Sequence, residues 1–354
     1  MAALLQQRAV PLLTGDLPGT SGMVRVAEED FFVEELPLYE PSGSGEHLLL
    51  TVEKRGRTTP EVAKEIALLL GARERDAGTA GLKDRRAVTV QRISVATRAP
   101  AEEALRIKGP GFRVLAAARH GNKLRPGHLR GNRFRIVVRG VVPEALPRAE
   151  AICARLRAQG AANLFGPQRF GKRGDNAALG HAILLRETQV RDRFLRRMAL
   201  SALQSELFNR CLAARIADGL FGTAIAGDVL KKRATGGLFV CEDPAVDAPR
   251  VASGEVDPAG PLPGHSLFAA RDEALRREQA VLAEAGVDKA CFAAGGDEME
   301  GARRPYRIAP DELQVEAGEP AAIVLRFALP KGSYALAVLR EITKSDLSEA
   351  DPAL

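Results

Sequence analysis

One carboxylate, Asp84, stands in a segment that is otherwise basic and begins with two glycines. It is the only carboxylate between Asp76 and Glu102, and basic residues flank it on both sides. Nearby positive charge favours the ionised form of a carboxylate. An ionised carboxylate can act as a nucleophile or a counter-ion and is a poor general acid. The same pattern is also typical of an Asp that closes a turn beside a solvated basic run.

Asp84 lies between a predicted helix and a predicted strand. The helix covers residues 59–70, with the hydroxyl of Thr59 as its cap, a proline in its first turn and a glycine after its end. The strand covers residues 88–95, where apolar residues alternate with one slip that predicts an irregularity. We therefore expect Asp84 at the edge of a sheet.

Both ends of the chain supply further strands. Residues 23–35 read as an extended segment with an acidic turn, and residues 48–52 as a buried strand. Residues 321–329 read as a central strand, followed by a helix over 333–342 that Ser333 could cap. This order predicts one sheet that is built from both chain ends.

The middle of the chain is mainly helical in pattern. Helices are predicted over 143–159, 187–217 and 272–285, whereas the Gly- and Pro-rich residues 236–263 read as loops. Within the second helix the spacing of the apolar residues predicts core positions, among them Phe194 and Met198.

Length and charge narrow the class of protein. A chain of 354 residues is long enough for two domains, and 45% hydrophobic with 27% charged residues is typical of a soluble globular protein. The formal net charge of +6 and the pI of about 9.3 favour a polyanionic partner.

No targeting, membrane or metal-binding signal is evident. The first residues lack the pattern of a secretory signal, and no apolar run approaches the roughly 18 residues of a membrane span. We therefore expect a cytoplasmic protein. The cysteines have neither zinc-ligand nor disulfide-framework spacing, and we expect reduced, buried thiols; they are Cys153, Cys211, Cys241 and Cys291.

A long basic run follows the Asp84 segment. Residues 105–142 contain ten Lys or Arg and no Asp or Glu. The run alternates with strand-like apolar residues, which favours a basic sheet edge that follows phosphates over a solvated face. Asn132 could bind a base edge or a sugar because an amide both donates and accepts, or it could be a turn residue after Gly131.

A second glycine motif resembles a phosphate-binding loop but lacks its chemistry. Gly166, Gly171 and Lys172 have the P-loop spacing, yet Arg173 stands where Ser or Thr is required, and bulky side chains fill the loop. We therefore predict no nucleoside triphosphate site here.

Seven blocks of the sequence, in order, resemble the TruD family of tRNA pseudouridine synthases. Together they span most of the chain, from about residue 25 to about residue 342. The blocks are Glu29-Asp30-Phe31, Gly45-Glu46-His47, Gly81-Leu82-Lys83-Asp84-Arg85, His120-Gly121-Asn122-Lys123-Leu124, Gly131-Asn132-Arg133-Phe134, the segment 163–171, and Leu329-Pro330-Lys331-Gly332-Ser333-Tyr334-Ala335.

The resemblance implies an α+β fold with a catalytic pseudouridine synthase domain and an inserted α/β TRUD domain. The catalytic domain, with its central mixed or antiparallel sheet, would comprise residues 1–159 and 307–354, and the insertion residues 160–306. The substrate would be uridine 13 in the D arm of tRNA. The reaction breaks the N-glycosidic bond and reattaches uracil through carbon, without a metal or other cofactor. We expect a monomer.

The resemblance also implies roles for individual residues. Asp84 would be the catalytic carboxylate, and Arg25, where the family commonly has Lys, would orient it. Phe31 alone would be interpreted as core, but the family places an aromatic there against the target base, where stacking is worth roughly 1–3 kcal/mol. Tyr334 corresponds to a second aromatic, and Asn132 to a ligand of the flipped nucleotide. The sequence leaves open whether Asp84 attacks covalently or promotes loss of the base.

Two other classes of function remain open on the residues alone. A non-catalytic RNA-binding protein or RNA chaperone would use the same basic run and aromatics and would tolerate loss of Asp84. A nuclease or phosphate-ester hydrolase would normally use clustered carboxylates or His with a metal, which the isolation of Asp84 disfavours.

Overall fold

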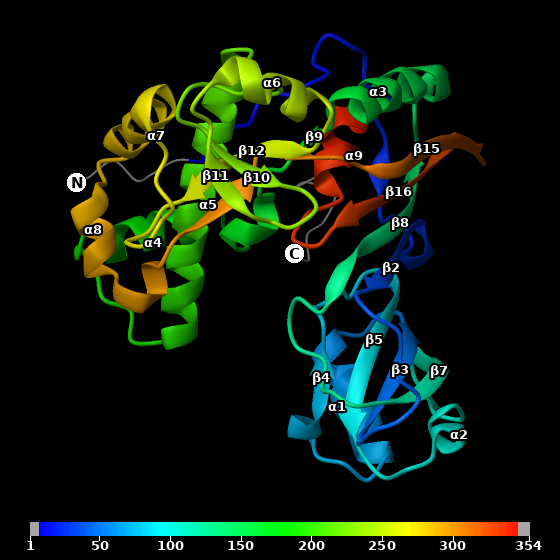
Figure 1. Cartoon of the computed structure of the whole chain (residues 1–354). Coiled ribbons are helices and arrows are strands. Elements are labelled where there is room, and N and C mark those ends of the chain that lie inside the picture. Colours follow the sequence, from blue (N-terminus) through cyan, green and yellow to red (C-terminus); the bar gives the residue numbers. More distant parts are fainter. Residues whose placement is uncertain (1–6, 346–354) are drawn as a thin grey trace. The chain divides into compact units, whose positions relative to one another are not determined.

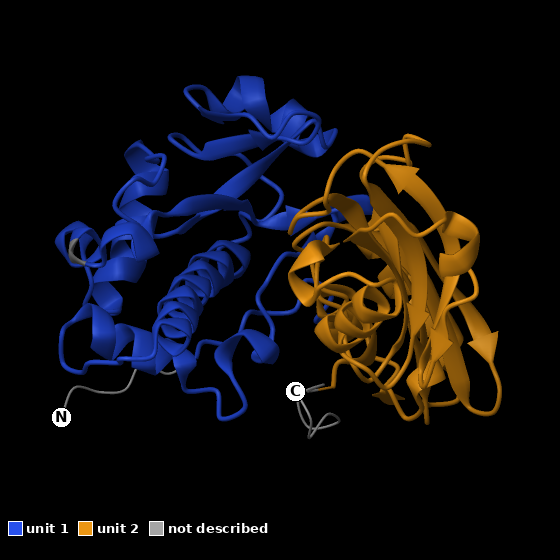
Figure 2. Cartoon of the chain, turned by 90° about the horizontal axis from the view of Figure 1, so that it is seen from below, with its two compact units in different colours: residues 1–16, 158–309, 352–354 blue, residues 17–157, 310–351 orange. Residues whose placement is uncertain are grey.

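The computed structural model describes residues 7–345, which fall into two compact units (Figure 2). Within the described residues, unit 2 comprises 17–157 and 310–345, and unit 1 comprises 7–16 and 158–309. The first of these, Gln7 and Arg8, donate hydrogen bonds to Gly174 and Glu206 of unit 1. The sequence interpretation had placed these first residues with the catalytic part.

Unit 2 is organised around one mixed sheet, with the strand order β15-β16-β8-β2-β5-β3-β7-β6 (Figure 1). β2 pairs with β5 in parallel and the other neighbours are antiparallel, while β1 joins β8 and β4 joins β5. The strands are β1 (Met23–Val24), β2 (Phe31–Pro37), β3 (His47–Lys54), β4 (Ala77–Thr79), β5 (Val88–Ala96), β6 (Lys108–Gly109), β7 (Phe112–His120), β8 (Leu129–Arg139), β15 (Asp311–Gly318) and β16 (Ala322–Pro330). The predicted sheet from both chain ends is confirmed, because β16 lies between β15 and β8.

Helix α1 packs on this sheet and forms its core with β3. Val62 and Ile66 of α1 are fully buried with Leu48 and Leu50. The predicted helix exists, but its cap is Thr58 and not Thr59, since the Thr58 hydroxyl accepts from the Glu61 N–H. The helices of unit 2 are α1 (Thr59–Leu69), α2 (Ala101–Ala104), α3 (Ala145–Gln159), whose last two residues belong to unit 1, and α9 (Leu336–Thr343).

Two predicted details of unit 2 are wrong. β5 pairs with β3 without a register shift from Thr89 to Ala96, so the expected irregularity is absent from this pairing. The apparent slip arises because Thr89 and Gln91 are polar residues at buried positions. Ser333 does not cap α9, because the residue before the helix is Ala335 and no side chain caps it.

Unit 1 combines helices with a four-stranded antiparallel sheet in the order β11-β10-β12-β13 and a short β9-β14 pair. Its strands are β9 (Ala161–Ala162), β10 (Val229–Lys232), β11 (Leu238–Val240), β12 (Val256–Leu262), β13 (Ala302–Pro305) and β14 (Arg307–Ile308). Its helices are α4 (Asn176–Leu184), α5 (Arg193–Ala217), α6 (Pro244–Ala252), α7 (Asp272–Glu284) and α8 (Lys289–Ala294). The long central helix in Figure 1 is α5.

Two interpretations of unit 1 are also wrong. Phe194 and Met198 are 73% and 38% exposed, because they lie in the first turns of α5, ahead of the part that packs. The segment 236–263 forms β11, α6 and β12, although its prolines favoured an interpretation as loops.

The cysteines mostly match the expectation of buried, reduced thiols. Cys153, Cys211 and Cys241 are buried and free, whereas Cys291 is partly exposed. No helix within residues 7–345 is long and apolar enough to cross a membrane.

Candidate active site

The Asp84 carboxylate lies on the loop between β4 and β5 of unit 2, where it forms an ion pair. Nη2 of Arg25 is 2.6 Å from Oδ2 of Asp84. The Arg25 side chain is only 11% exposed, whereas that of Asp84 is 42% exposed. The pair therefore has one shielded partner and one that solvent or a substrate can reach.

Arg25 also covers the ring of Phe31. It follows β1 with a φ of +60°, a left-handed conformation that is uncommon outside glycine and costs of order 1–3 kcal/mol. This conformation accompanies the placement of the guanidinium carbon 4.2 Å from the Phe31 ring centroid. Phe31 is 3% exposed and meets Phe134 edge to face at 6.3 Å. Arg25 thus contacts two of the predicted site residues at once.

The loop that carries Asp84 is held by a buried lysine from the end of β3. Nζ of Lys54 donates to the backbone carbonyl oxygens of Asp84 at 2.8 Å and of Lys83 at 3.3 Å. Lys54 is 1% exposed, and burial lowers its pKa from 10.5 to about 8, partly opposed by the negative charge of Asp84. The buried ammonium group of Lys54 is therefore hydrogen-bonded to the backbone of Asp84, the candidate catalytic residue.

The loop that carries Asp84 also contains a lysine, Lys83, whose buried side chain forms an ion pair that fixes the loop. Nζ of Lys83 lies 2.8 Å from Oε2 of Glu35, and these side chains are 6% and 1% exposed. The Lys83 N–H donates to the Thr59 hydroxyl, which in turn donates to Oε1 of Gln91. Thr59, first interpreted as a helix cap, instead links the Asp84 loop to β5.

Asn132 lies in β8, directly opposite Glu35 of β2 and Leu329 of β16. Side chains alternate along a strand, so Asn132 and Glu35 project from one face of the sheet, as does Phe31. Oδ1 of Asn132 is buried and accepts no hydrogen bond from the described residues. A buried acceptor without a donor costs about 1–3 kcal/mol.

Tyr334 lies between β16 and α9 and is 37% exposed. The end of β16 at Pro330 pairs with Gly131, so Tyr334 follows closely on the strand beside Asn132. Arg25 contacts both Asp84 and Phe31, and Asn132 and Tyr334 lie on neighbouring segments.

The predicted basic sheet edge is only partly correct. β8, which carries several of its arginines, is an interior strand between β16 and β2. Three of the ten cations form ion pairs: Arg113, Arg133 and Arg139. The side chains of three more donate to backbone carbonyls, and these are Arg119, Lys123 and Arg130. The other four side chains make no hydrogen bond or ion pair within residues 7–345, and these are Arg106, Lys108, Arg125 and Arg135.

The segment 163–171 supports the backbone of unit 1. Nδ2 of Asn163 donates to the Pro305 carbonyl, and Arg304 donates to Oδ1 of the same Asn. Residues Pro167–Phe170 form a short 3-10 helix. The bulky side chains of this turn include Phe170, which is 2% exposed.

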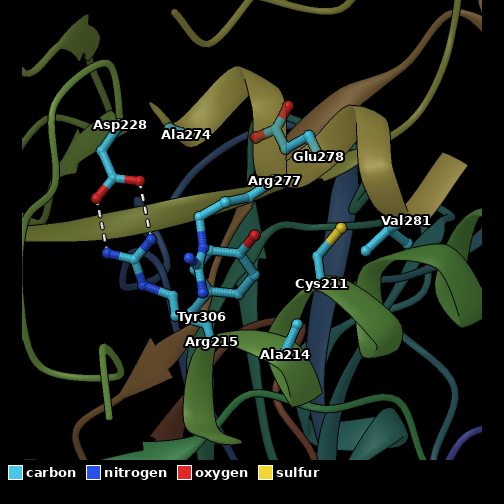
Figure 3. Close-up of a pocket in the computed structure, with 9 residues that line it drawn as sticks. All are labelled: Cys211, Ala214, Arg215, Asp228, Ala274, Arg277, Glu278, Val281 and Tyr306. Carbon is cyan, nitrogen blue, oxygen red and sulfur yellow. Dashed lines mark hydrogen bonds and ion pairs between the residues drawn. The ribbon is translucent and has the colours of Figure 1, made fainter. Parts of the chain in front are cut away.

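A small cavity in unit 1 is separate from the predicted site residues (Figure 3). Its volume is about 20 Å³, which suits a single water molecule and is far too small for a nucleotide. Arg215 and Asp228 form an ion pair at its side, with Nη2 and Oδ2 2.6 Å apart. Glu278 also lines it, and burial raises the pKa of this carboxyl. None of the predicted site residues lines this cavity.

Sequence reasoning missed Lys54 and Glu35 as parts of this site. The available signal was their position: Glu35 and Lys54 each follow a buried valine by two residues, at Val33 and Val52, and strand alternation therefore places both on a buried face. The partners of both lie about 30 to 50 residues further along the chain, at Asp84 and Lys83.

Known proteins resemble this chain over nearly its whole length. A model of the family tRNA pseudouridine synthase D (TruD) matches residues 9–191 and 188–342. The tRNA pseudouridine synthase D of Anaeromyxobacter sp. (strain Fw109-5) is 53% identical over 350 residues, 96% of this chain and 98% of the relative. That of a Thermus thermophilus strain is 44% identical over 359 residues, 100% of this chain and 98% of the relative. A crystal structure of the putative TruD from Methanosarcina mazei has a similar fold, with a TM-score of 0.75 at 24% identity, covering 96% of this chain and 97% of that one.

Proposed function

Because the chain belongs to the TruD family of tRNA pseudouridine synthases, we propose that Asp84 is the carboxylate with which it isomerises uridine 13 in the D arm of tRNA. The observation that supports this role is the ion pair of Asp84 with Arg25, which leaves the carboxylate 42% exposed on its loop. The ion pair holds the carboxylate in place while a substrate can still approach it.

The isomerisation conserves all atoms of the nucleotide. The bond from C1′ of the ribose to N1 of uracil breaks, a bond from C1′ to C5 forms, and the proton on C5 leaves while N1 gains one. A single ionised carboxylate can serve by attacking the nucleotide covalently or by promoting loss of the base and stabilising the cationic sugar. Both routes need Asp84 charged and correctly directed.

The other predicted residues are proposed to hold the flipped nucleotide. Oδ1 of Asn132, a buried acceptor, suits an N–H donor such as N3–H of uracil. Phe31 and Tyr334 offer ring faces for the base. The guanidinium of Arg25 occupies one side of the Phe31 ring, so a base that stacks there must displace it.

We further propose that unit 2 corresponds to the catalytic domain and unit 1 to the inserted TRUD domain. The enzyme would act as a cytoplasmic monomer on tRNA with no cofactor. Full activity after dialysis against a chelator, and a monomer mass in solution, would support these points.

The deciding experiment incubates unmodified tRNA transcripts with the wild type and with Asp84→Asn and maps pseudouridine by carbodiimide chemistry. Glu102→Gln, which changes an exposed carboxylate of the same unit, is the matched control. Conversion of one D-arm uridine by the wild type and the control, and not by Asp84→Asn, is expected. A transcript with cytidine at position 13 should remain unmodified. Equal RNA binding without any conversion would instead favour a non-catalytic RNA-binding protein.

A further inference from the structure

Lys54 is a fully buried lysine whose hydrogen-bond partners are backbone atoms. It is 1% exposed and one of the largest fully buried side chains among the described residues. Its ammonium group donates to the carbonyl oxygens of Lys83 and Asp84, and no carboxylate of the described residues lies within ion-pair distance of it. A buried charge without a paired carboxylate is costly, so an uncharged side chain would fill this space at lower cost.

We infer that Lys54 is a positioning residue that fixes the backbone carbonyls on both sides of the Asp84 Cα and so directs the Asp84 carboxylate. This inference rests on the proposed catalytic role of Asp84. The geometry supports it, because two hydrogen bonds from one rigidly buried group restrain two consecutive carbonyls, and the Asp84 Cα, from which the carboxylate side chain branches, lies between them. Misplacing a reacting group by about 1 Å can cost on the order of 100-fold in rate.

The surroundings of Lys54 set its response to pH. The charged groups that act on it are Asp84 and Lys83 of the loop, Glu61 of α1 and Glu28 of the 3-10 turn Glu28–Asp30. The residues opposite Lys54 on the neighbouring strands are Thr89 of β5 and Phe112 of β7, and neither carries a charge. Burial lowers the pKa of Lys54 to about 8. The ammonium group therefore begins to lose its proton just above neutral pH, and its hold on the two carbonyls weakens.

The test compares single-turnover rates on tRNA between pH 6.5 and 9.5 for the wild type, Lys54→Met and Lys54→Arg. Lys54→Met should lower the rate ~10–100-fold at pH 7 with an unchanged dissociation constant for tRNA. Lys54→Arg keeps a permanent charge with several donors, so it should recover much of the rate. The wild-type rate should fall above about pH 8, and this fall should move to higher pH in Lys54→Arg.

Lys64→Met, which removes an exposed lysine of α1, is the matched control and should match the wild type throughout. If Lys54→Met does not fold, the pH profile of Lys54→Arg decides the question alone. A Lys54→Met enzyme with normal rate, or a fall near pH 8 that is identical in Lys54→Arg, would overturn the inference. An active Asp84→Asn enzyme would instead contradict the proposed function, so the two failures are distinct.

Discussion

Nη2 of Arg25 lies 2.6 Å from Oδ2 of Asp84 while the same guanidinium covers the ring of Phe31. One side chain thus contacts both the proposed catalytic carboxylate and an aromatic face. The left-handed backbone at Arg25 indicates that this placement is maintained against local strain.

Replacing Arg25 should therefore reduce turnover more than RNA binding. A hydrogen bond to a charged group contributes about 1.5–3 kcal/mol, so Arg25→Ala should lower the single-turnover rate roughly 10–150-fold. Arg25→Lys should recover part of it, since lysine supplies charge without the planar fork. The exposed Arg55, paired with Glu29, gives the control Arg55→Ala. An Arg25→Ala enzyme of normal rate would show that the ion pair has no catalytic role.

Replacing Asn132 should lower activity without lowering stability, whereas replacing an ordinary buried amide lowers stability. Its Oδ1 has no donor within the described chain, so Asn132→Ala should leave the free energy of unfolding unchanged or slightly higher. The same variant should lose about 3–10-fold in kcat/KM for tRNA, the value of one neutral hydrogen bond.

Asn209 provides the contrast for that experiment. It donates to the Phe165 carbonyl and accepts from the Phe165 N–H, both at 2.9 Å. Asn209→Ala should therefore lower the free energy of unfolding by about 1–3 kcal/mol. If Asn132→Ala is destabilised to the same degree, its Oδ1 is satisfied in solution and the proposed contact with the base loses its support.

The buried pair of Lys83 and Glu35 should make a large coupled contribution to stability. Removing one partner leaves an uncompensated charge, so Lys83→Met and Glu35→Leu should each cost about 3–5 kcal/mol. The double variant should recover most of that loss, because both charges are removed together. Urea unfolding of the four proteins measures the coupling, and additive losses would contradict it.

From the sequence one could predict that both chain ends share one sheet and where several of its strands lie, but not β7, β15 or the strand order. The sequence also predicts Asp84, Arg25 and Phe31 as site residues, but this prediction comes from the resemblance to the family and not from the periodicity of the residues. Asp84 by itself is more typical of a residue that closes a turn. The sheet and these residues could therefore be named before the structure, although their contacts could not.

What the sequence could not predict depends on packing between distant segments. Thr59 has the residue type of a cap, yet the adjacent Thr58 caps α1 and Thr59 bonds to Gln91 instead. Phe194 follows a helical apolar pattern, but it precedes the part of α5 that meets other elements. Lys54 ends a strand, where lysine is normally solvated, yet it is buried and its ammonium group bonds to two carbonyls of the Asp84 loop.

Lys54 should also make stability and activity change in opposite directions with pH. Its pKa is about 8 in the folded protein against a reference value of 10.5, so between these values the unfolded state binds more protons. The contribution of Lys54 to the free energy of unfolding therefore rises with pH across this window, by at most about 1.4 kcal/mol per pH unit, and is constant below it. Urea unfolding at pH 7, 8 and 9 should show the wild type gaining stability relative to Lys54→Met, while the wild-type rate declines. A difference between the two proteins that stays constant or shrinks as pH rises would show that Lys54 is not held with a lowered pKa.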